Sequence, residues 1–216
     1  MKNRSKPILV FLLSVFFGWS SMAQENWDQI KSKEGITVFT RTNNVMAFKE
    51  FKASMIVAGK VNDFLSVLYD VEGLTSWGYN LTMAKLLERK GDTLQIYYAV
   101  AKAPWPYKDR DGIYSNEIRW DAPSKTLFVD IELLETGFDA DENYVRMDGY
   151  GFWRIKQLSS NELEVNFQMQ IDPAGSIKAW MANMVASDSP YHTLLGLREA
   201  LKNKKYQGKS YDILKK

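Results

Sequence analysis

The sequence has no cysteine and only one histidine, and these absences exclude several kinds of site. Without cysteine there can be no disulfide, no thiolate nucleophile and no cysteine-ligated metal. With His192 as the single histidine, a zinc site built on two histidines is excluded. The sequence also contains no P-loop and no GxGxxG, GxSxG or HExxH motif. We therefore expect no metal, no cofactor and no catalytic residue, and we interpret His192 as part of an amphipathic helix.

No apolar run in the sequence reaches the length that a transmembrane helix requires. The run at residues 8–19 follows Lys2, Arg4 and Lys6 and precedes the small-residue stretch 20–23. A transmembrane helix needs roughly 18 or more apolar residues, so this layout is typical of a signal peptide. We expect residues 1–23 to be cleaved near Ala23 and the protein to be exported, to the periplasm or outside the cell. An uncleaved membrane anchor is the alternative.

The chain also lacks a strong excess of charge of one sign. Its formal net charge is +2, and loss of residues 1–23 would remove three basic and no acidic residues, which leaves −1. This balance argues against a nucleic-acid partner. Residues 24–216 are enough for one domain with a sizeable core, and no repeat or linker divides them.

Alternation of apolar and polar residues dominates the middle of the chain. It predicts strands at residues 36–41, 48–57, 86–89, 93–100, 111–120, 126–134, 144–157 and 163–171. Helical spacing predicts short helices at residues 25–33, 62–73 and 74–80. Because short turns join most of the strands, including one at Asn43-Asn44, we expect an antiparallel meander.

The end of the chain changes from strand to helix. In the strand at 163–171 the odd-numbered residues are apolar and the even-numbered ones polar, so one face is dry. Apolar residues then recur at helical spacing from Ile177 onward, with a break expected near Pro190. Such a helix must cover the dry face of the sheet. The fold class is therefore α+β, with a curved antiparallel sheet wrapped around a long C-terminal helix and a space between them.

Two alternative functions stay open at this point. The first is an enzyme that uses carboxylates as acid and base, with Asp109, Asp111, Glu117 and Glu132 as candidates. Asp-Arg-Asp sequences such as 109–111 are more often structural ion-pair networks. The second is a protein-interaction module whose core is completely filled.

Several motifs, taken together, resemble the START family of lipid-transfer domains. They are Pro104–Pro106 followed by Asp109–Asp111, then Gly151–Ile155, then Asp172–Gly175 ahead of an Ile-x-x-Trp-Met-x-Asn helix. The resemblance extends from Trp27 to Lys204, and the Pro-Trp-Pro element with Asp-Arg-Asp is its most specific part.

The resemblance implies a helix-grip fold with an internal hydrophobic tunnel for one apolar molecule. Ligands of the family are sterols, phospholipids and ceramides, carried without covalent chemistry, although the broader superfamily includes cyclases and hydrolases. It implies a lipid or other hydrophobic small molecule as partner, with transient membrane contact. The expected export signal departs from the usual setting of the family, so a periplasmic or secreted carrier or sensor is the hypothesis.

Candidate ligand-binding residues follow from the resemblance and from the alternation. The expected helix wall consists of Trp180, Met181, Met184 and Val185, and the expected sheet wall of Tyr98, Tyr114, Phe128, Trp153, Phe167 and Met169. Methionine side chains suit a wall that adapts to a flexible chain. Ordinary core packing is the alternative for each residue taken singly.

Overall fold

The computed structural model describes residues 27–42, 46–139 and 141–215, and for residues 179, 181, 182 and 184–186 the backbone only. The expected signal peptide at 1–23 and the expected turn at Asn43-Asn44 lie outside the described residues.

Ten strands form a single sheet in the described part of the chain. They are β1 (Asp28–Lys33), β2 (Ile36–Arg41), β3 (Glu50–Ala58), β4 (Leu81–Lys90), β5 (Leu94–Ala101), β6 (Arg110–Asp121), β7 (Thr126–Leu134), β8 (Val145–Arg146), β9 (Asp148–Ser159) and β10 (Glu162–Asp172). The order is β1-β2-β3-β10-β9-β7-β6-β5-β4, and the two-residue strand β8 pairs with β6. The neighbours along that order are antiparallel, as the short turns predict.

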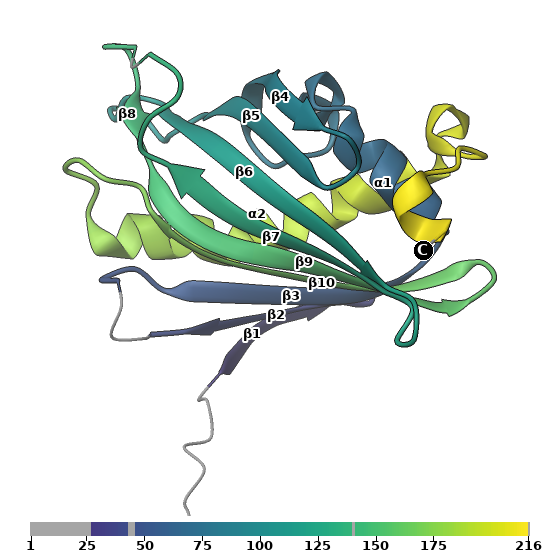
Figure 1. Ribbon diagram of the computed structural model, residues 1–216. Helices are drawn as coiled ribbons and strands as arrows, with labels where there is room; N and C mark the ends of the chain where they lie inside the picture. The colour runs from purple at the N-terminus through teal and green to yellow at the C-terminus, as the bar shows by residue number, and fades with distance from the viewer. Residues whose placement is uncertain (1–26, 43–45, 140, 216) are drawn as a thin grey trace, which may run out of the picture.

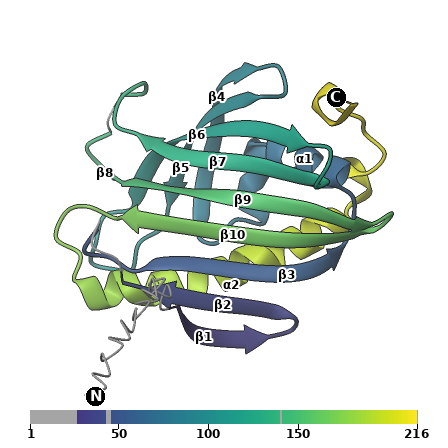
Figure 2. The same cartoon turned by 60° about the horizontal axis from the view of Figure 1, so that its bottom comes forward.

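Two α-helices and three short 3-10 helices complete the described elements. They are α1 (Val61–Tyr69), α2 (Ala179–Lys202) and the 3-10 helices Glu72–Ser76, Lys204–Tyr206 and Asp212–Lys215. Both α-helices lie on the same face of the curved sheet, where α2 crosses β2 and β3 (Figures 1 and 2). The predicted α+β class and the long C-terminal helix against a curved sheet are thus confirmed.

The strand β10 shows why the helix and the sheet need each other. Leu163, Val165, Phe167 and Met169 are all buried, and they alternate with residues on the opposite face that are partly exposed. The buried side of α2 includes Leu194, Leu197 and Leu201. Each Å² of apolar surface that this contact removes from water stabilises the fold by roughly 25 cal/mol.

Three local predictions need correction. In place of the expected helix at residues 74–80 there is a 3-10 helix, Glu72–Ser76, and no helix continues through residues 77–80. Residues 28–33 form the edge strand β1 instead of a helix, because a hairpin through Glu34 and Gly35, both with positive φ, pairs them with β2. The segment also has no buried apolar stripe that a helix could present to the core. The expected break at Pro190 is absent: α2 runs continuously from Ala179 to Lys202, with the proline inside it.

A glycine in α2 allows the helix to approach the segment that precedes β4. A Cβ atom added at Gly196 would overlap the backbone carbonyl of Trp77, directly after the 3-10 helix Glu72–Ser76. The close approach requires glycine here, and it holds Trp77 between α2 and the sheet.

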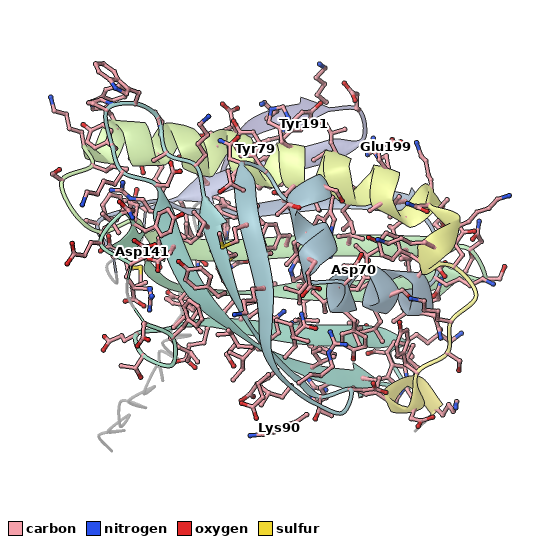
Figure 3. The ribbon with its side chains drawn as sticks, turned by 90° about the horizontal axis from the view of Figure 1, so that it is seen from above. Asp70, Tyr79, Lys90, Asp141, Tyr191 and Glu199 are labelled. Atoms are coloured by element: carbon pink, nitrogen blue, oxygen red, sulfur yellow. The ribbon has the colours of Figure 1, made fainter. Side chains whose placement is uncertain are left out.

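We predict that Gly196→Ala destabilises the protein, although alanine favours helix by about 1 kcal/mol over glycine. The overlap with the Trp77 backbone forces a shift in a packed interior, so we expect the free energy of unfolding to fall by about 1–3 kcal/mol in urea denaturation. The control is Glu199→Ala on the exposed side of α2 (Figure 3), which should change stability by less than about 0.5 kcal/mol. A more stable Gly196→Ala variant would contradict the packing argument.

Candidate ligand-binding cavity

A largely apolar cavity lies between the sheet, α1, the 3-10 helix Glu72–Ser76 and α2. Its volume is about 220 Å³. Apart from tryptophan and tyrosine, the apolar lining residues are Phe48, Phe51, Leu68, Leu74, Leu81, Ala99, Ala101, Ala103, Pro104, Ile131, Met147, Phe167, Met169, Ile171, Pro173 and Ile177. The volume exceeds the roughly 150 Å³ of an apolar cavity that accommodates benzene and is smaller than the roughly 300–1,000 Å³ of drug-sized pockets.

Stacked and edge-on aromatic rings form one wall of the cavity. Trp153 and Phe167, on neighbouring strands, stack with ring centroids 3.9 Å apart and 9° between their planes. Trp77 packs edge-on against Trp153 at 6.4 Å, and Phe51 packs edge-on against Phe167 at 5.3 Å. Edge-on and offset contacts of this kind fix the rings relative to one another. The wall is therefore a rigid apolar surface.

A second aromatic pair lines the cavity on β5 and β6. The rings of Tyr97 and Tyr114 are stacked at 5.0 Å with 6° between their planes. Burial, followed by the nearby charge of Asp111, raises the pKa of Tyr114 to about 12, and burial also raises the pKa of Tyr97. Both phenols stay neutral near pH 7, so they offer hydroxyl groups to a ligand without adding charge.

Polar groups are few and most lie toward one end of the cavity. The last residues of β10 and the first residues of β3 and β6 lie at this end. The pairing of Phe51 with Met169 shows that the start of β3 lies beside the end of β10. Among the described lining residues the polar ones other than the aromatic rings are Lys49, Asn80, Lys102, Arg110, Ser189 and Thr193. The buried indole N–H of Trp77 has no hydrogen-bond partner among the described residues.

Arg110 joins the two loops at this end. Its Nε donates to the carbonyl oxygen of Pro173 at 2.9 Å, and its Nη2 donates to that of Ala174 at 3.1 Å. Its Nη1 donates to the carbonyl oxygen of Lys108. Burial lowers the pKa of Arg110, and the nearby charge of Asp109 opposes that effect. The guanidinium therefore lies in a site that disfavours an uncompensated charge.

Of the six sheet residues that the sequence predicts as ligand-binding, four line the cavity. They are Tyr114, Trp153, Phe167 and Met169. Alternation along β6, β9 and β10 directs these side chains toward α2, so the structure brings them together at one wall.

Tyr98 and Phe128 face away from the cavity, contrary to the assignment from the sequence. Tyr98 packs on Phe138 at 4.5 Å in a second apolar cluster with Val100 and Ile113. Because both faces of β5 are buried there, alternation of polarity gives no direction, and the assignment is wrong by one residue. Phe128 lies on the outer face of β7, with the guanidinium of Arg119 4.0 Å from its ring centroid.

The nominated helix residues lie in the first turns of α2. Trp180 is 62% exposed and does not line the cavity. The side chains of Met181, Met184 and Val185 lie outside the described residues. Among the described side chains of α2, Ser189 and Thr193 line the cavity. They lie one and two helical turns after Val185.

Several lining residues escaped the sequence reading, chief among them Trp77, Tyr97 and Phe51. For Tyr97 the signal was available, since Tyr97, Ala99 and Ala101 share one face of β5. For Trp77 no local pattern exists, because its position depends on the approach of Gly196 in the folded chain.

The four candidate carboxylates do not line the cavity. Asp111 is buried in an ion pair with Arg146, with 2.8 Å between Oδ2 and Nη2, and Asp109 accepts a hydrogen bond from the backbone N–H of Ala103. Glu117 and Glu132 are exposed. The ring of His192 is exposed and stacks on Tyr79, which lies beside α2 in Figure 3. These positions give no support to acid–base catalysis in the cavity.

Within the described residues there is no cluster of three or more histidine or acidic side chains that could hold a metal ion. Nor does any helix in the described ranges have the length and hydropathy needed to cross a bilayer.

Comparisons with known proteins agree with this architecture. The STAR-related lipid transfer protein of Xanthomonas axonopodis (residues 25–204) superposes with a TM-score of 0.76 and 28% identity, over 82% of this chain and 99% of that one. Human StAR-related lipid transfer protein 5 superposes with a TM-score of 0.70 and 15% identity, over 82% and 86% of the two chains.

By sequence, the mouse phosphatidylcholine transfer protein is 21% identical over 183 residues, which cover 82% of this chain and 85% of the mouse protein. No family model matches the sequence. Both solved structures nevertheless share the fold of this chain over 82% of its length. The resemblance to START lipid-transfer domains that the sequence motifs predict is therefore confirmed.

Proposed function

We propose that this protein binds one hydrophobic molecule, a lipid or a sterol-like compound, in the cavity under α2 and acts as a carrier or sensor without catalysis. The observation that carries this proposal is the aromatic wall of Trp77, Trp153 and Phe167, whose rings are apolar, buried and packed against one another. Binding would draw on apolar area, at roughly 25 cal/mol per Å² removed from water. The presence of the cavity argues against an interaction module with a filled core.

The cavity volume bears on how such a ligand enters. About 220 Å³ is smaller than typical drug-sized pockets, so a two-chain phospholipid requires movement of the surrounding segments. The loop at 102–109 and the segment that leads into α2 bound the end with the polar groups, and they are the natural segments to move.

Export is part of the same proposal. The basic start, the short apolar run and the small residues before Ala23 favour a cleaved signal peptide and a periplasmic or secreted carrier.

Transient membrane contact is proposed for the loop end of the molecule. Trp105 is 92% exposed at the tip of the β5–β6 loop, whose residues Ala103 and Pro104 line the cavity. Trp180, at the start of α2, follows the lining residue Ile177. Exposed indole rings favour the membrane–water interface, so both would bring the opening toward a lipid surface.

We predict that protein purified from its own host carries a hydrophobic molecule at one-to-one stoichiometry. Native mass spectrometry detects the adduct, and solvent extraction followed by mass analysis identifies it. A protein that is empty and also binds nothing from a lipid panel after delipidation would contradict the carrier proposal.

Ala101→Trp should block the cavity. Ala101 is half-buried at the end of β5 and lines the cavity, so an indole there occupies ligand space with little strain on the core. We expect the Kd for the extracted ligand to rise at least about tenfold, equivalent to about 1.4 kcal/mol. Ile56→Trp on the exposed face of β3 is the matched control and should leave the Kd unchanged. Equal affinity for both variants would place the ligand elsewhere.

Trp105→Ala should weaken association with phosphatidylcholine vesicles about fivefold to tenfold, since an interfacial indole contributes about 1 kcal/mol or more. Leu158→Ala, an exposed apolar residue near the opposite end of β9, serves as the control and should have no effect in the same flotation assay. The same loss from both variants would argue against docking through the loop end.

A further inference from the structure

The charges that line the cavity are all of one sign among the described residues. Lys49, Lys102 and Arg110 line it, and no aspartate or glutamate does. A chain with 28 basic and 26 acidic residues gives no reason to expect this. The asymmetry is therefore local to the cavity.

The three cations gather at one end. Lys102 directly follows β5, and Arg110 at the start of β6 pairs with Ala101 at the end of β5. Lys49 directly precedes β3, next to Phe48, whose carbonyl oxygen accepts a hydrogen bond from Gln170 on β10. These residues, here called the cationic end, face the apolar wall of Trp77 and Trp153 along the cavity.

No carboxylate within the described residues forms an ion pair with the three cations of the cationic end, although the nearby charge of Asp109 offsets part of the charge of Arg110. Arg110 is only 4% exposed, and its hydrogen bonds go to three backbone carbonyl oxygens, with no ion pair to a carboxylate among the described residues. Neither the ammonium of Lys49 nor that of Lys102 forms an ion pair within the described ranges, and the buried Asp111 is paired with Arg146. Of the three cations Arg110 is buried, Lys49 is half-buried and Lys102 is exposed. Buried charges in proteins are normally paired with an opposite charge, so a bound anion would complete the compensation of Arg110.

The backbone hydrogen bonds of Arg110 show that it also braces the loops. This role by itself does not require a charge inside a ligand cavity, and it does not account for the two lysines. Guanidinium and ammonium groups around one site are the usual means of binding carboxylate and phosphate oxygens.

We infer that the ligand is an amphiphile with an anionic head group, a carboxylate or a phosphate monoester, held at the cationic end with its apolar chain against the aromatic wall. This inference rests on the proposed function and narrows its ligand class. The modest cavity volume agrees with a single chain.

The test compares four molecules with the same chain and different head groups: decanoate, decyl phosphate, decanol and decyltrimethylammonium. Isothermal titration calorimetry with delipidated protein gives the Kd for each. We expect the two anions to bind about tenfold or more tighter than decanol, because charge-assisted hydrogen bonds replace neutral ones. The cation should bind most weakly. Whichever anion binds tighter distinguishes a fatty-acid source from a phospholipid-derived one.

Charge-removing variants locate the head group. The double variant Lys49→Gln/Lys102→Gln should reduce the ratio of anion affinity to decanol affinity about threefold to tenfold. Lys156→Gln, the same charge change at an exposed position on the outer face of β9, is the control and should have no effect. Arg110→Gln removes a side chain that braces the loops, so its binding data are interpreted together with its thermal unfolding curve. The lysine variants provide the decisive test of the head-group position.

Two negative outcomes are distinguishable. Equal affinity for decanol and both anions, unchanged in the lysine variants, would overturn the anionic head group and leave a hydrophobic ligand in place. Failure of all four molecules to bind, with no adduct on the protein from its host, would overturn the proposed function as well.

Discussion

The burial of the sheet's concave face under α2 is the contact on which the remaining structure depends. Apolar residues of β10 such as Val165 and Leu163 are fully buried, and Leu194 and Leu197 of α2 provide the buried surface opposite. The sheet curves while α2 runs on as one helix, so the two surfaces separate away from their closest contacts (Figure 1). The cavity occupies that separation, and aromatic rings form one of its walls.

The approach of α2 to the segment before β4 fixes the inner boundary of this space. Gly196 permits helix and backbone to touch at Trp77, and Trp77 packs on Trp153 of the sheet. Stability and binding are therefore linked through the same residues. A ligand that contacts these rings would stabilise the folded state by mass action, as any molecule that binds only the native protein does.

Polarity along the cavity follows from the order of the strands. The starts of β3 and β6 and the ends of β5 and β10 meet at one end of the sheet, so residues far apart in the sequence are neighbours there. Lys49, Lys102 and Arg110 come together in this way, while the opposite part of the lining is apolar and aromatic. An amphiphile also has one polar and one apolar end, so the cavity would bind it in one orientation.

The sequence alone determined the fold class, most of the strands and the dry face of β10, because alternation and helical spacing are local properties of the chain. It also determined the family resemblance, through the Pro-Trp-Pro and Asp-Arg-Asp elements. It did not determine the inward face of β5, where Tyr97 and Tyr98 are both buried, or the role of residues 28–33, which pair through a turn at Glu34 and Gly35. Only the tertiary structure decided those points, and it alone brought Trp77 and Arg110 to the cavity, because such placements depend on contacts between segments distant in the sequence.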